Sequence, residues 1–487
     1  MTKIAVTSER VKSMDRFGDI MHDLKDKHVI VLGFGRQGRA LARWLPSQGA
    51  TITVSDRRSR EQLKLGPDEF ADVDFVLGEH PLTLLDDADL ICISGGVPLE
   101  LPLIQEAIER GVPITNDAQL FMEHCIAPVI GITGSAGKTT TTTLVGQIMA
   151  AAGHTTHVGG NIGDVLLDKL DDIKPDDIVI MELSSFQLEL MTTSPRVAAV
   201  LNITPNHLDR HKTMDRYMAA KANIVRYQMP EDVAVLCKDD EGSAALQAIV
   251  VPEELVWFSM NDMVADGAFM MGERLMLAGS ASFDYVPHVL MDRSEIPLRG
   301  DHNVMNVLAA CAITGAMGLA LDLPGVEPET MAQVIREFKP VDHRLETVRV
   351  VDDVTYINDS IATAPERLIA ALRSFEEPLV LLLGGADKDL PWQDAMHMAL
   401  RQSRHIVLFG KEGEKQVRTK VMRMLRLLGA QTDIVTCVDT LDEAVHTARD
   451  IAQAGDVVLL SPGGTSYDAY PDFAVRGEHF RKIVSNL

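Results

Sequence analysis

The stretch PVIGITGSAGKTTTTTLVGQIMAAAG, residues 128–153, decides how this chain folds. An apolar run of strand length turns through a glycine-rich loop and continues directly into a helical pattern. Glycines let the backbone wrap a phosphate, Lys138 reaches the terminal phosphates, and the Thr139 hydroxyl can hold Mg²⁺. The stretch therefore predicts an ATP site, with contacts expected from Gly134, Ser135, Ala136, Gly137, Lys138, Thr139 and Thr140.

This loop departs from the commonest phosphate-binding pattern at one position. Ile132 stands where GxxxxGK[ST] has its first glycine, so a generic motor or GTPase loop is a poorer match. A plain glycine turn before a helix is the alternative. The glycine count, Lys138 and the strand–helix context all favour the phosphate site.

Apolar runs that end in Gly, Ser or Asp recur on both sides of this stretch, with helical patterns between them. That alternation is typical of parallel sheets with crossover helices. The expected strands are 28–33, 51–56, 75–78, 90–94, 113–115, 128–134, 177–185, 198–204, 232–240, 355–360, 378–387, 405–410, 432–438 and 456–464. Short pieces between 256 and 298 are expected to form hairpins flanking the central sheet.

We therefore predict an α/β protein of three domains. An N-terminal Rossmann-like domain spans 1–127, a central P-loop ATPase-like domain with a parallel sheet spans 128–340, and a C-terminal Rossmann-like domain spans 341–487. The length of 487 residues agrees with roughly three domains of ordinary size.

The charge balance excludes one class of partner. The chain has 46 Lys plus Arg against 70 Asp plus Glu, a formal net charge of −24, which disfavours nucleic acid but leaves room for a small phosphate ligand. Five scattered cysteines indicate a reducing compartment. Neither a signal peptide nor a membrane span is expected, so we predict a cytoplasmic protein.

A second glycine-rich loop lies in the first domain. Gly33, Gly35 and Gly38 form a GxGxxG pattern after a strand, and Asp56 ends the next strand. A dinucleotide, or any nucleotide with a diphosphate, uses such a loop with an acid about 20 residues on. An NAD-dependent oxidoreductase is one interpretation, but hydride transfer does not explain the P-loop. A tight strand–helix turn is the other alternative.

Glu182 and His207 follow two central strands. Strand ends of a doubly wound sheet converge on the ligand crevice, so both side chains are candidates to lie near the phosphates that Lys138 holds. Oxygen ligands suit Mg²⁺. A structural role for His207 is as well supported by the sequence as a metal-binding one.

Ten segments together resemble the Mur ligase family of peptidoglycan synthesis, and most closely its glutamate-adding members. They run nearly the whole chain in order: GITGSAGKT (131–139), GGNIG (159–163), ELSSFQLE (182–189), LNITPNHLDRH (201–211), Tyr217 with AAKANI (219–224), GDHNVMN (300–306), HRLE (343–346), NDSIATAPE (358–366), LGGADKD (383–389) and SPGGTSYDAYPDFAVRG (461–477). Separated motifs in the right order are far more specific than any single one.

The resemblance implies a reaction: ATP-dependent ligation of D-glutamate to UDP-N-acetylmuramoyl-L-alanine through an acyl phosphate, with Mg²⁺ as cofactor. Residues implied to bind the UDP-substrate are Gly33, Gly35, Arg36, Gly38, Asp56, Ser94 and Asn161. The expected partners are that substrate and glutamate, and the chain is expected to be a monomer.

The resemblance also assigns the ATP and glutamate sites. Asn303 and Asn306, with Arg344 opposite, would position ATP from both sides of an interdomain cleft. Implied metal ligands are Thr139, Glu182, His207 and, if carbamylated, Lys221. Implied catalytic residues are Lys138, Glu182, His207, Lys221 and Lys388, and implied glutamate contacts are Thr363, Lys388, Ser466 and Phe473.

The chain departs from the family pattern near the glutamate site. Ile361 replaces a common lysine and Ala364 a common asparagine, while Gly463-Gly464-Thr465 replaces an Ala-Cys-Ala-like run and Asn206 an acid. These departures leave open ligation of L-glutamate instead of D-glutamate. From a different class, a nucleotide-binding protein without turnover is the remaining alternative, although all the implied catalytic residues are present.

Overall fold

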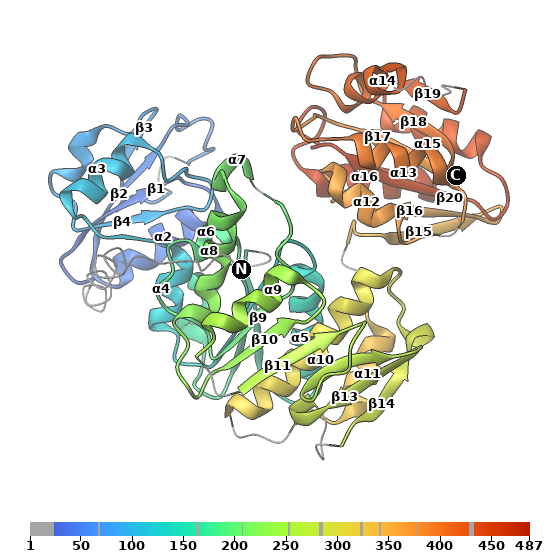
Figure 1. Cartoon of the computed structure of the whole chain (residues 1–487). Helices are drawn as coiled ribbons and strands as arrows, with labels where there is room; N and C mark the ends of the chain where they lie inside the picture. The colour runs from blue at the N-terminus through green and yellow to red at the C-terminus, as the bar shows by residue number, and fades with distance from the viewer. Residues whose placement is uncertain are drawn as a thin grey trace. The chain divides into compact units, whose positions relative to one another are not determined.

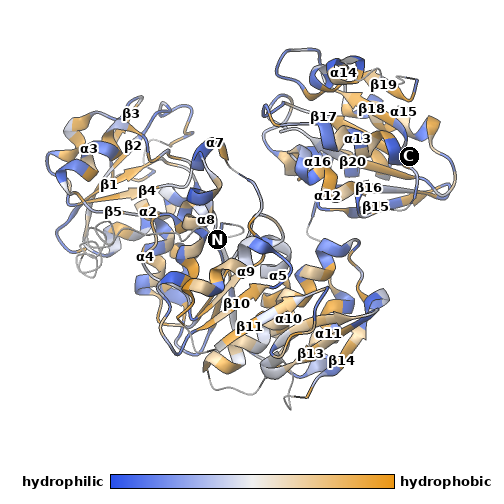
Figure 2. Ribbon diagram, viewed as in Figure 1, coloured by the Kyte–Doolittle hydropathy of each residue, from blue (hydrophilic) through white to orange (hydrophobic). Residues whose placement is uncertain are grey.

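The computed structural model describes residues 24–66, 69–161, 165–206, 208–251, 254–281, 286–321, 325–339, 342–375, 377–427 and 433–487. Within them the chain builds three sheets, whose strands are covered by helices (Figure 1). The predicted α/β class is confirmed. Hydrophobic residues concentrate along the strands (Figure 2), because central strands of a parallel sheet are buried on both faces.

The first sheet has the strand order β3-β2-β1-β4-β5, and its described strand pairs are all parallel. Its loops after β1, β2 and β4 therefore open at one edge, as in a Rossmann fold. Its strands and helices are β1 (His28–Leu32), α2 (Arg36–Ser47), β2 (Thr51–Asp56), β3 (Asp74–Leu77), β4 (Leu90–Ile93), α3 (Pro102–Arg110), β5 (Ile114–Thr115) and α4 (Asp117–His124).

The second sheet has the order β14-β13-β12-β11-β10-β9-β6-β8-β7. It is parallel from β7 to β12, and β13 and β14 then pair antiparallel. Its elements are β6 (Val129–Thr133), α5 (Lys138–Ala151), β7 (Thr156–Gly160), η2 (Leu166–Asp172), β8 (Ile178–Glu182), α6 (Ser185–Leu188), β9 (Val197–Val200), α7 (Leu208–His211), α8 (Met214–Arg226), β10 (Val233–Cys237), α9 (Glu241–Ala245), β11 (Glu254–Ser259), β12 (Gly267–Met271), β13 (Arg274–Ala278), β14 (His288–Asp292), α10 (Asp301–Leu321) and α11 (Pro328–Glu337).

The third sheet has the order β15-β16-β20-β17-β18-β19, parallel except for the edge pair β15–β16. Strand β20 is buried along its whole length at the centre. Its elements are β15 (Glu346–Val351), β16 (Val354–Asn358), α12 (Pro365–Leu372), β17 (Leu379–Gly384), α13 (Gln393–Gln402), β18 (Ser403–Phe409), α14 (Val417–Leu427), β19 (Val435–Val438), α15 (Leu441–Ile451), β20 (Val457–Gly463) and α16 (Phe473–Ser485).

The predicted strands are confirmed, with two additions and one refinement. The sequence analysis did not predict β7 or β15, which lie at the edges of their sheets. The segment between 256 and 298 was expected to flank the central sheet; β11 to β14 instead extend that sheet from β10 by hydrogen bonding.

Contacts divide the chain into two compact units. One unit holds residues 1–295 and 305–336, and the other holds 296–304 and 337–487. The first unit contains the first two sheets, and the second contains the third sheet. The domain boundaries at 127 and 340 stay predictions.

Helix α10 is the one helix in the described residues that is long and apolar enough to cross a membrane. In its most apolar window 83% is buried inside the fold, as in the core helix of a globular protein.

Candidate functional site

The glycine-rich loop between β6 and α5 folds as a phosphate-binding loop. Gly137 has φ +86°, and a Cβ at this position would overlap Asn306 Oδ1, so only glycine fits. The Lys138 ammonium lies back over the loop and donates to the carbonyl of Gly134 at 2.9 Å. The loop is braced by Asn202, whose side-chain oxygen accepts the Ala136 N–H at 2.8 Å.

A hydrogen-bonded row of polar side chains lies at the carboxyl ends of the central strands. The Thr139 hydroxyl donates to Glu182 Oε2 at 2.9 Å, and the Asn161 amide donates to Glu182 Oε1 at 2.9 Å. Glu182 is buried, so its charge needs these donors. A carboxylate and a hydroxyl are the hard oxygen donors that Mg²⁺ binds, so Thr139 and Glu182 fit such a site.

Lys221, on α8, contacts the residues at the start of the same loop. Its side chain is buried, and its ammonium donates to Thr133 Oγ1 at 3.1 Å and to the Gly134 carbonyl at 3.0 Å. Burial and the nearby charge of Lys138 lower the pKa of Lys221 well below its ordinary value. The ring of Tyr217 lies 5.0 Å from the amine.

His207 lies outside the described residues, so its expected metal role is untested by position. Among the side chains that the structure describes, no group of three or more His, Cys, Asp or Glu gathers in a metal-holding arrangement. Thr139, Glu182 and Lys221 are thus the described members of the expected metal site.

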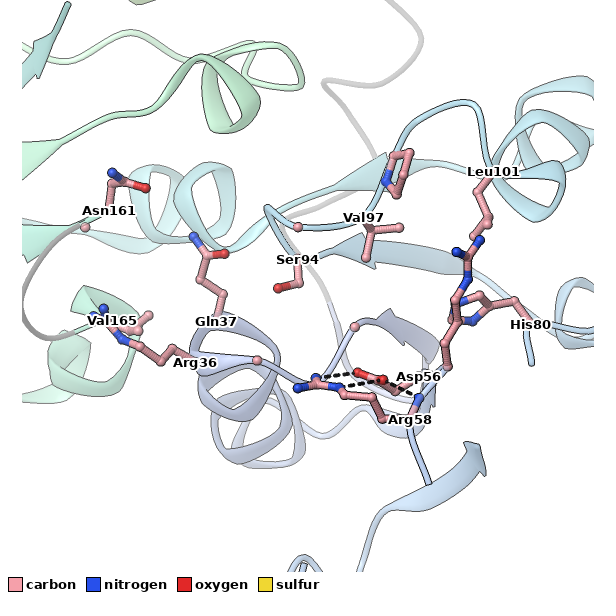
Figure 3. Close-up of a pocket in the computed structure, with 16 residues that line it drawn as sticks. Arg36, Gln37, Asp56, Arg58, His80, Ser94, Val97, Leu101, Asn161 and Val165 are labelled. Carbon is pink, nitrogen blue, oxygen red and sulfur yellow. Dashed lines mark hydrogen bonds and ion pairs between the residues drawn. The ribbon is translucent and has the colours of Figure 1, made fainter. Parts of the chain in front are cut away.

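A cavity of about 460 Å³ opens beside the glycine loop of the first sheet (Figure 3). Six of the seven residues predicted to hold the UDP-substrate line it: Gly33, Gly35, Arg36, Asp56, Ser94 and Asn161. The seventh, Gly38, lies outside the lining. A Cβ on Gly38 would overlap the Gly33 carbonyl, so this glycine lets α2 approach the loop.

Asp56 is the acid at the end of β2, and it anchors the loop. Its carboxylate accepts the Phe34 N–H at 2.7 Å. It also accepts the guanidinium of Arg58 at 2.8 Å, as Figure 3 shows. Burial alone would raise the pKa of Asp56, but the hydrogen bonds from Arg58 and Phe34 outweigh it and lower the pKa to about 2. The carboxylate is therefore ionised at neutral pH.

Four polar residues of the cavity lining were missed by the sequence analysis: Gln37, Arg57, Arg58 and His80. Two arginines directly after a strand that ends in Asp56 were an available signal, because strand ends face the ligand crevice. Gln37 and His80 carried no comparable signal. Arg57 and Arg58 place positive charge at a cavity suited to a diphosphate.

The residues expected to hold ATP lie on two segments besides the P-loop. Asn306 lies against Gly137, as described above. Asn303, one turn earlier on α10, donates its amide to the Arg299 carbonyl at 2.8 Å. Arg344 lies just before β15. Burial of His302 and the nearby charge of Arg344 lower the pKa of His302 to about 4. Asn303, His302 and Arg344 belong to the second compact unit.

Thr363, Lys388 and Ser466, which are expected to hold glutamate, lie on loops at the carboxyl ends of β16, β17 and β20, and Phe473 begins α16. Lys388 donates to the Thr363 hydroxyl at 3.2 Å. Ser466 is buried, and its carbonyl accepts the Tyr470 N–H at 2.7 Å. The Phe473 carbonyl accepts the Ser360 hydroxyl at 2.7 Å. The third sheet therefore gathers all four predicted residues at one edge.

A buried arginine that the sequence analysis missed ties these loops together. Arg476 is fully buried and donates to the Ser360 carbonyl at 2.8 Å and the Gly464 carbonyl at 3.2 Å. Burial lowers its pKa to about 10. The nearby Asp359 carboxyl is also buried, which raises its pKa to about 7.

Two of the four departures from the family pattern, Ile361 and Ala364, differ in their surroundings. The Ile361 carbonyl accepts the guanidinium of Arg367 at 3.2 Å, so a cation from α12 lies close to the apolar substitution. Ala364 precedes α12 and its side chain makes no capping hydrogen bond to that helix.

Three family models match the chain in succession. They are the Mur ligase MurD-like N-terminal domain over 27–116, the Mur ligase middle domain over 132–314, and the Mur ligase glutamate ligase domain over 343–464. Together they span all three sheets.

Two proteins similar in sequence carry the same name, UDP-N-acetylmuramoylalanine--D-glutamate ligase. That of Clostridium botulinum (strain Okra / Type B1) is 37% identical over 95% of this chain and 98% of its own length. That of Symbiobacterium thermophilum is 40% identical over 95% of this chain and 98% of its own length.

A solved structure shares the fold. UDP-N-acetylmuramate-alanine ligase MurC from Thermotoga maritima matches 94% of this chain and 99% of its own with a TM-score of 0.56 and 19% sequence identity.

Proposed function

Because the chain belongs to the Mur ligase family, we propose that it is the ATP-dependent ligase that joins D-glutamate to UDP-N-acetylmuramoyl-L-alanine in peptidoglycan precursor synthesis. The observation that carries the proposal is the position of Asn161. This residue lines the UDP-substrate cavity and donates to Glu182, which accepts the Thr139 hydroxyl of the P-loop. One side chain thus joins the two sites that such a reaction must bring together.

The reaction has two steps in which the chain's residues bind and orient the reactants. A carboxylate oxygen of the L-alanyl group attacks the γ-phosphorus of ATP, the bond to the β-phosphate oxygen breaks, and ADP leaves. The amine of glutamate then attacks the acyl carbon, loses a proton, and displaces inorganic phosphate. Lys138 would turn from the Gly134 carbonyl to the transferred phosphoryl group, whose negative charge it stabilises.

Mg²⁺ would be held by Thr139 and Glu182, and by His207 as the resemblance implies. When bound, the ion screens the negative charges of the phosphates. The Thr139 hydroxyl donates to Glu182 at 2.9 Å, so the two oxygens are close enough together to bind one ion.

Lys221 is proposed to carry a carbamate, which the resemblance implies. The ammonium first loses one proton. The uncharged amine then attacks CO₂, a nitrogen–carbon bond forms while one carbon–oxygen π bond breaks, and a second proton leaves the nitrogen, so that a cation becomes an anion over the two proton losses. The buried position of Lys221 favours the uncharged amine, and its contact with Thr133 and Gly134 places it beside the P-loop.

Glutamate is proposed to bind at Lys388, Thr363, Ser466 and Phe473. The contact of Lys388 with Thr363 supports a shared carboxylate site, because both are donors. D-glutamate is the proposed isomer, since both relatives described above are named for it. Asn303, Asn306 and Arg344 are proposed to position ATP. A monomeric state and a cytoplasmic location stay predictions.

The test is phosphate release from ATP and Mg²⁺ with UDP-N-acetylmuramoyl-L-alanine, run in parallel with D-glutamate, L-glutamate and no amino acid. We expect release to depend on D-glutamate. Dependence on L-glutamate would keep the ligase chemistry and change the substrate isomer. Release that needs neither amino acid, or no release at all, would contradict the proposal.

A further inference from the structure

Arg210 reaches from α7 of the second sheet to the wall of the UDP-substrate cavity. Its guanidinium donates to the Gly96 carbonyl at 3.3 Å and to the Val97 carbonyl at 3.0 Å. Both carbonyls belong to the segment 94–98, which we call the wall segment. Ser94, Gly96, Val97 and Pro98 of this segment line the cavity, as Figure 3 shows for Ser94 and Val97.

The wall segment must hold its position closely. It packs against the glycine loop after β1: a Cβ on Gly33 would lie 2.9 Å from the Val97 side chain and 3.2 Å from Ser94 Cβ. From its own domain the segment is fixed by the amide oxygen of Gln37, which accepts the Gly95 N–H at 3.0 Å. Arg210 fixes its far side from the other sheet. A shift of the wall segment would therefore change the cavity's shape.

The guanidinium of Arg210 is itself held by aromatic rings. It lies over the Phe186 ring, 4.6 Å from its centre. The Phe186 ring stacks on His211 with centres 5.2 Å apart and an interplanar angle of 4°. Stacking on a ring face already restricts the conformations of the Arg210 side chain. Less conformational entropy is therefore lost when its guanidinium donates to the two carbonyls.

The same ring array continues to the P-loop. His211 lies 5.3 Å from the Tyr217 ring, and the Tyr217 hydroxyl shares a hydrogen bond of 2.9 Å with Ser135. Ser135 also donates to the Thr204 carbonyl at 2.8 Å. A continuous row of packed side chains thus connects the cavity wall with the loop expected to bind ATP.

We propose that Arg210 is a positioning residue for the UDP-bearing substrate, which acts by holding the wall segment in its binding shape from the P-loop side. It binds no substrate atom in this role, because its two terminal nitrogens are directed at backbone carbonyls. The inference rests on the proposed function for the identity of the substrate, and it adds a residue that the motif assignments leave out.

A simple tie between the two domains is the competing explanation, and the chain offers a matched control. Arg43, on α2, forms an ion pair of 2.5 Å with Asp168 of η2, which also links the first and second sheets. Neither residue lines the cavity. If Arg210 only tied the domains together, Arg43→Ala and Arg210→Ala would have similar consequences.

The experiment measures binding of UDP-N-acetylmuramoyl-L-alanine to the full chain by calorimetry, in the absence of ATP. Arg210→Ala is expected to weaken binding about ten- to a hundredfold, since two hydrogen bonds from a charged donor are lost. Arg210→Lys keeps the charge without the planar fork and should recover only part of the affinity. Arg43→Ala should bind within about twofold of wild type, because exposed ion pairs contribute little.

Kinetics then separate positioning from direct contact. For Arg210→Ala we expect the KM of the UDP-substrate to rise while kcat at saturation stays within about threefold. The affinity ratio of Arg210→Ala to wild type should be the same at low and high salt, because a direct contact with phosphate would be screened.

The possible failures are distinct. Equal binding by Arg210→Ala and wild type would overturn the inference and leave the proposed function intact. Equal losses in Arg210→Ala and Arg43→Ala, full recovery by Arg210→Lys, or a loss that disappears at high salt would also overturn it. If wild type itself does not bind UDP-N-acetylmuramoyl-L-alanine, the proposed function fails instead.

Discussion

Two glycine-rich turns, one after β1 and one after β6, have the same local plan and different neighbours. Each leads from a buried parallel strand into a helix, and each has a glycine at φ +86°: Gly33 in the first and Gly137 in the second. Around the first turn the charged neighbours include Arg36, Asp56, Arg57 and Arg58. Around the second they are Lys138, Lys221 and Glu182.

Both turns provide backbone N–H groups, and the residues at the ends of the adjacent strands determine the chemistry of each site. In the first turn the Phe34 N–H is occupied by a carboxylate, and the cavity beside it is open. In the second turn two lysines donate to one carbonyl, that of Gly134. The first arrangement fits recognition of a nucleotide, and the second fits transfer of a phosphoryl group.

The largest expected effect tests that division of labour. Lys138→Ala should lower kcat by at least about a hundredfold, because a cation aimed at the transferred phosphoryl group is lost. Binding of UDP-N-acetylmuramoyl-L-alanine, measured separately by calorimetry, should change less than about threefold. A dehydrogenase that used the first turn would keep its rate. Unchanged turnover in Lys138→Ala would therefore contradict a role of the second turn in phosphoryl transfer.

Glycine substitutions in the first turn should differ in their effect on the free energy of unfolding. Gly38→Ala would place a methyl group on the Gly33 carbonyl and should lower the free energy of unfolding by about 1–3 kcal/mol. Gly35→Ala is the control, because the nearest atom to its added Cβ is Ser94 Oγ at 3.9 Å. Urea unfolding of both variants checks this. A Gly35→Ala variant as unstable as Gly38→Ala would show that the turn tolerates no side chain at all.

Among the kinetic constants, Asp56→Asn should change the KM of the UDP-substrate and leave kcat nearly unchanged. The substitution removes a charged acceptor from Phe34 and Arg58, so the KM for the UDP-substrate should rise about tenfold. At saturating substrate kcat should stay within about twofold, since the second turn is untouched. Steady-state kinetics measure both values. A fall in kcat equal to that of Lys138→Ala would contradict separate roles of the two turns in substrate binding and in turnover.

The smallest effect is a pH dependence. The pKa of Asp56 is about 2 in the fold against an ordinary value of 3.8. Its lowered pKa stabilises the fold above pH 3.8, and this contribution is lost as the pH falls toward 2. Between pH 5 and 3 wild type should therefore lose more unfolding free energy than Asp56→Asn, as measured by urea unfolding at each pH. Parallel losses would contradict the role of Asp56 as an anchor.

Sequence patterns predicted the strands that are buried, because such strands have continuous apolar sequences. The strands β4, β6, β17 and β20 are apolar runs because both faces of the sheet are covered there. Strand β7 was missed because Thr156–Gly160 ends in two glycines and lies partly exposed at an edge. Strand β15 (ETVRVV) mixes polar and apolar residues at an edge, and no residue of it is fully buried.

The site residues that could be predicted from the sequence are also those whose position depends on local sequence. Lys138, Thr139, Glu182 and Asp56 could be predicted because a strand end or a local motif fixes their place. Arg210 could not, because its partners Gly96 and Val97 lie more than 110 residues away in the chain. Arg476 was hidden for a similar reason: its contact with Ser360 spans 116 residues and depends on how α16 packs.

The segment 296–304 makes the compact unit of the third sheet discontinuous in sequence. Arg299 pairs with Glu377 at 2.8 Å and lies over the Phe375 ring, so a piece of chain that precedes α11 belongs to the same compact unit as the third sheet. A genetic exchange at residue 340 between relatives would carry Phe375 and Glu377 into a chimera while leaving Arg299 behind. Recombination that respects the folded unit needs two crossovers, one on each side of 296–304, in addition to the one near 337.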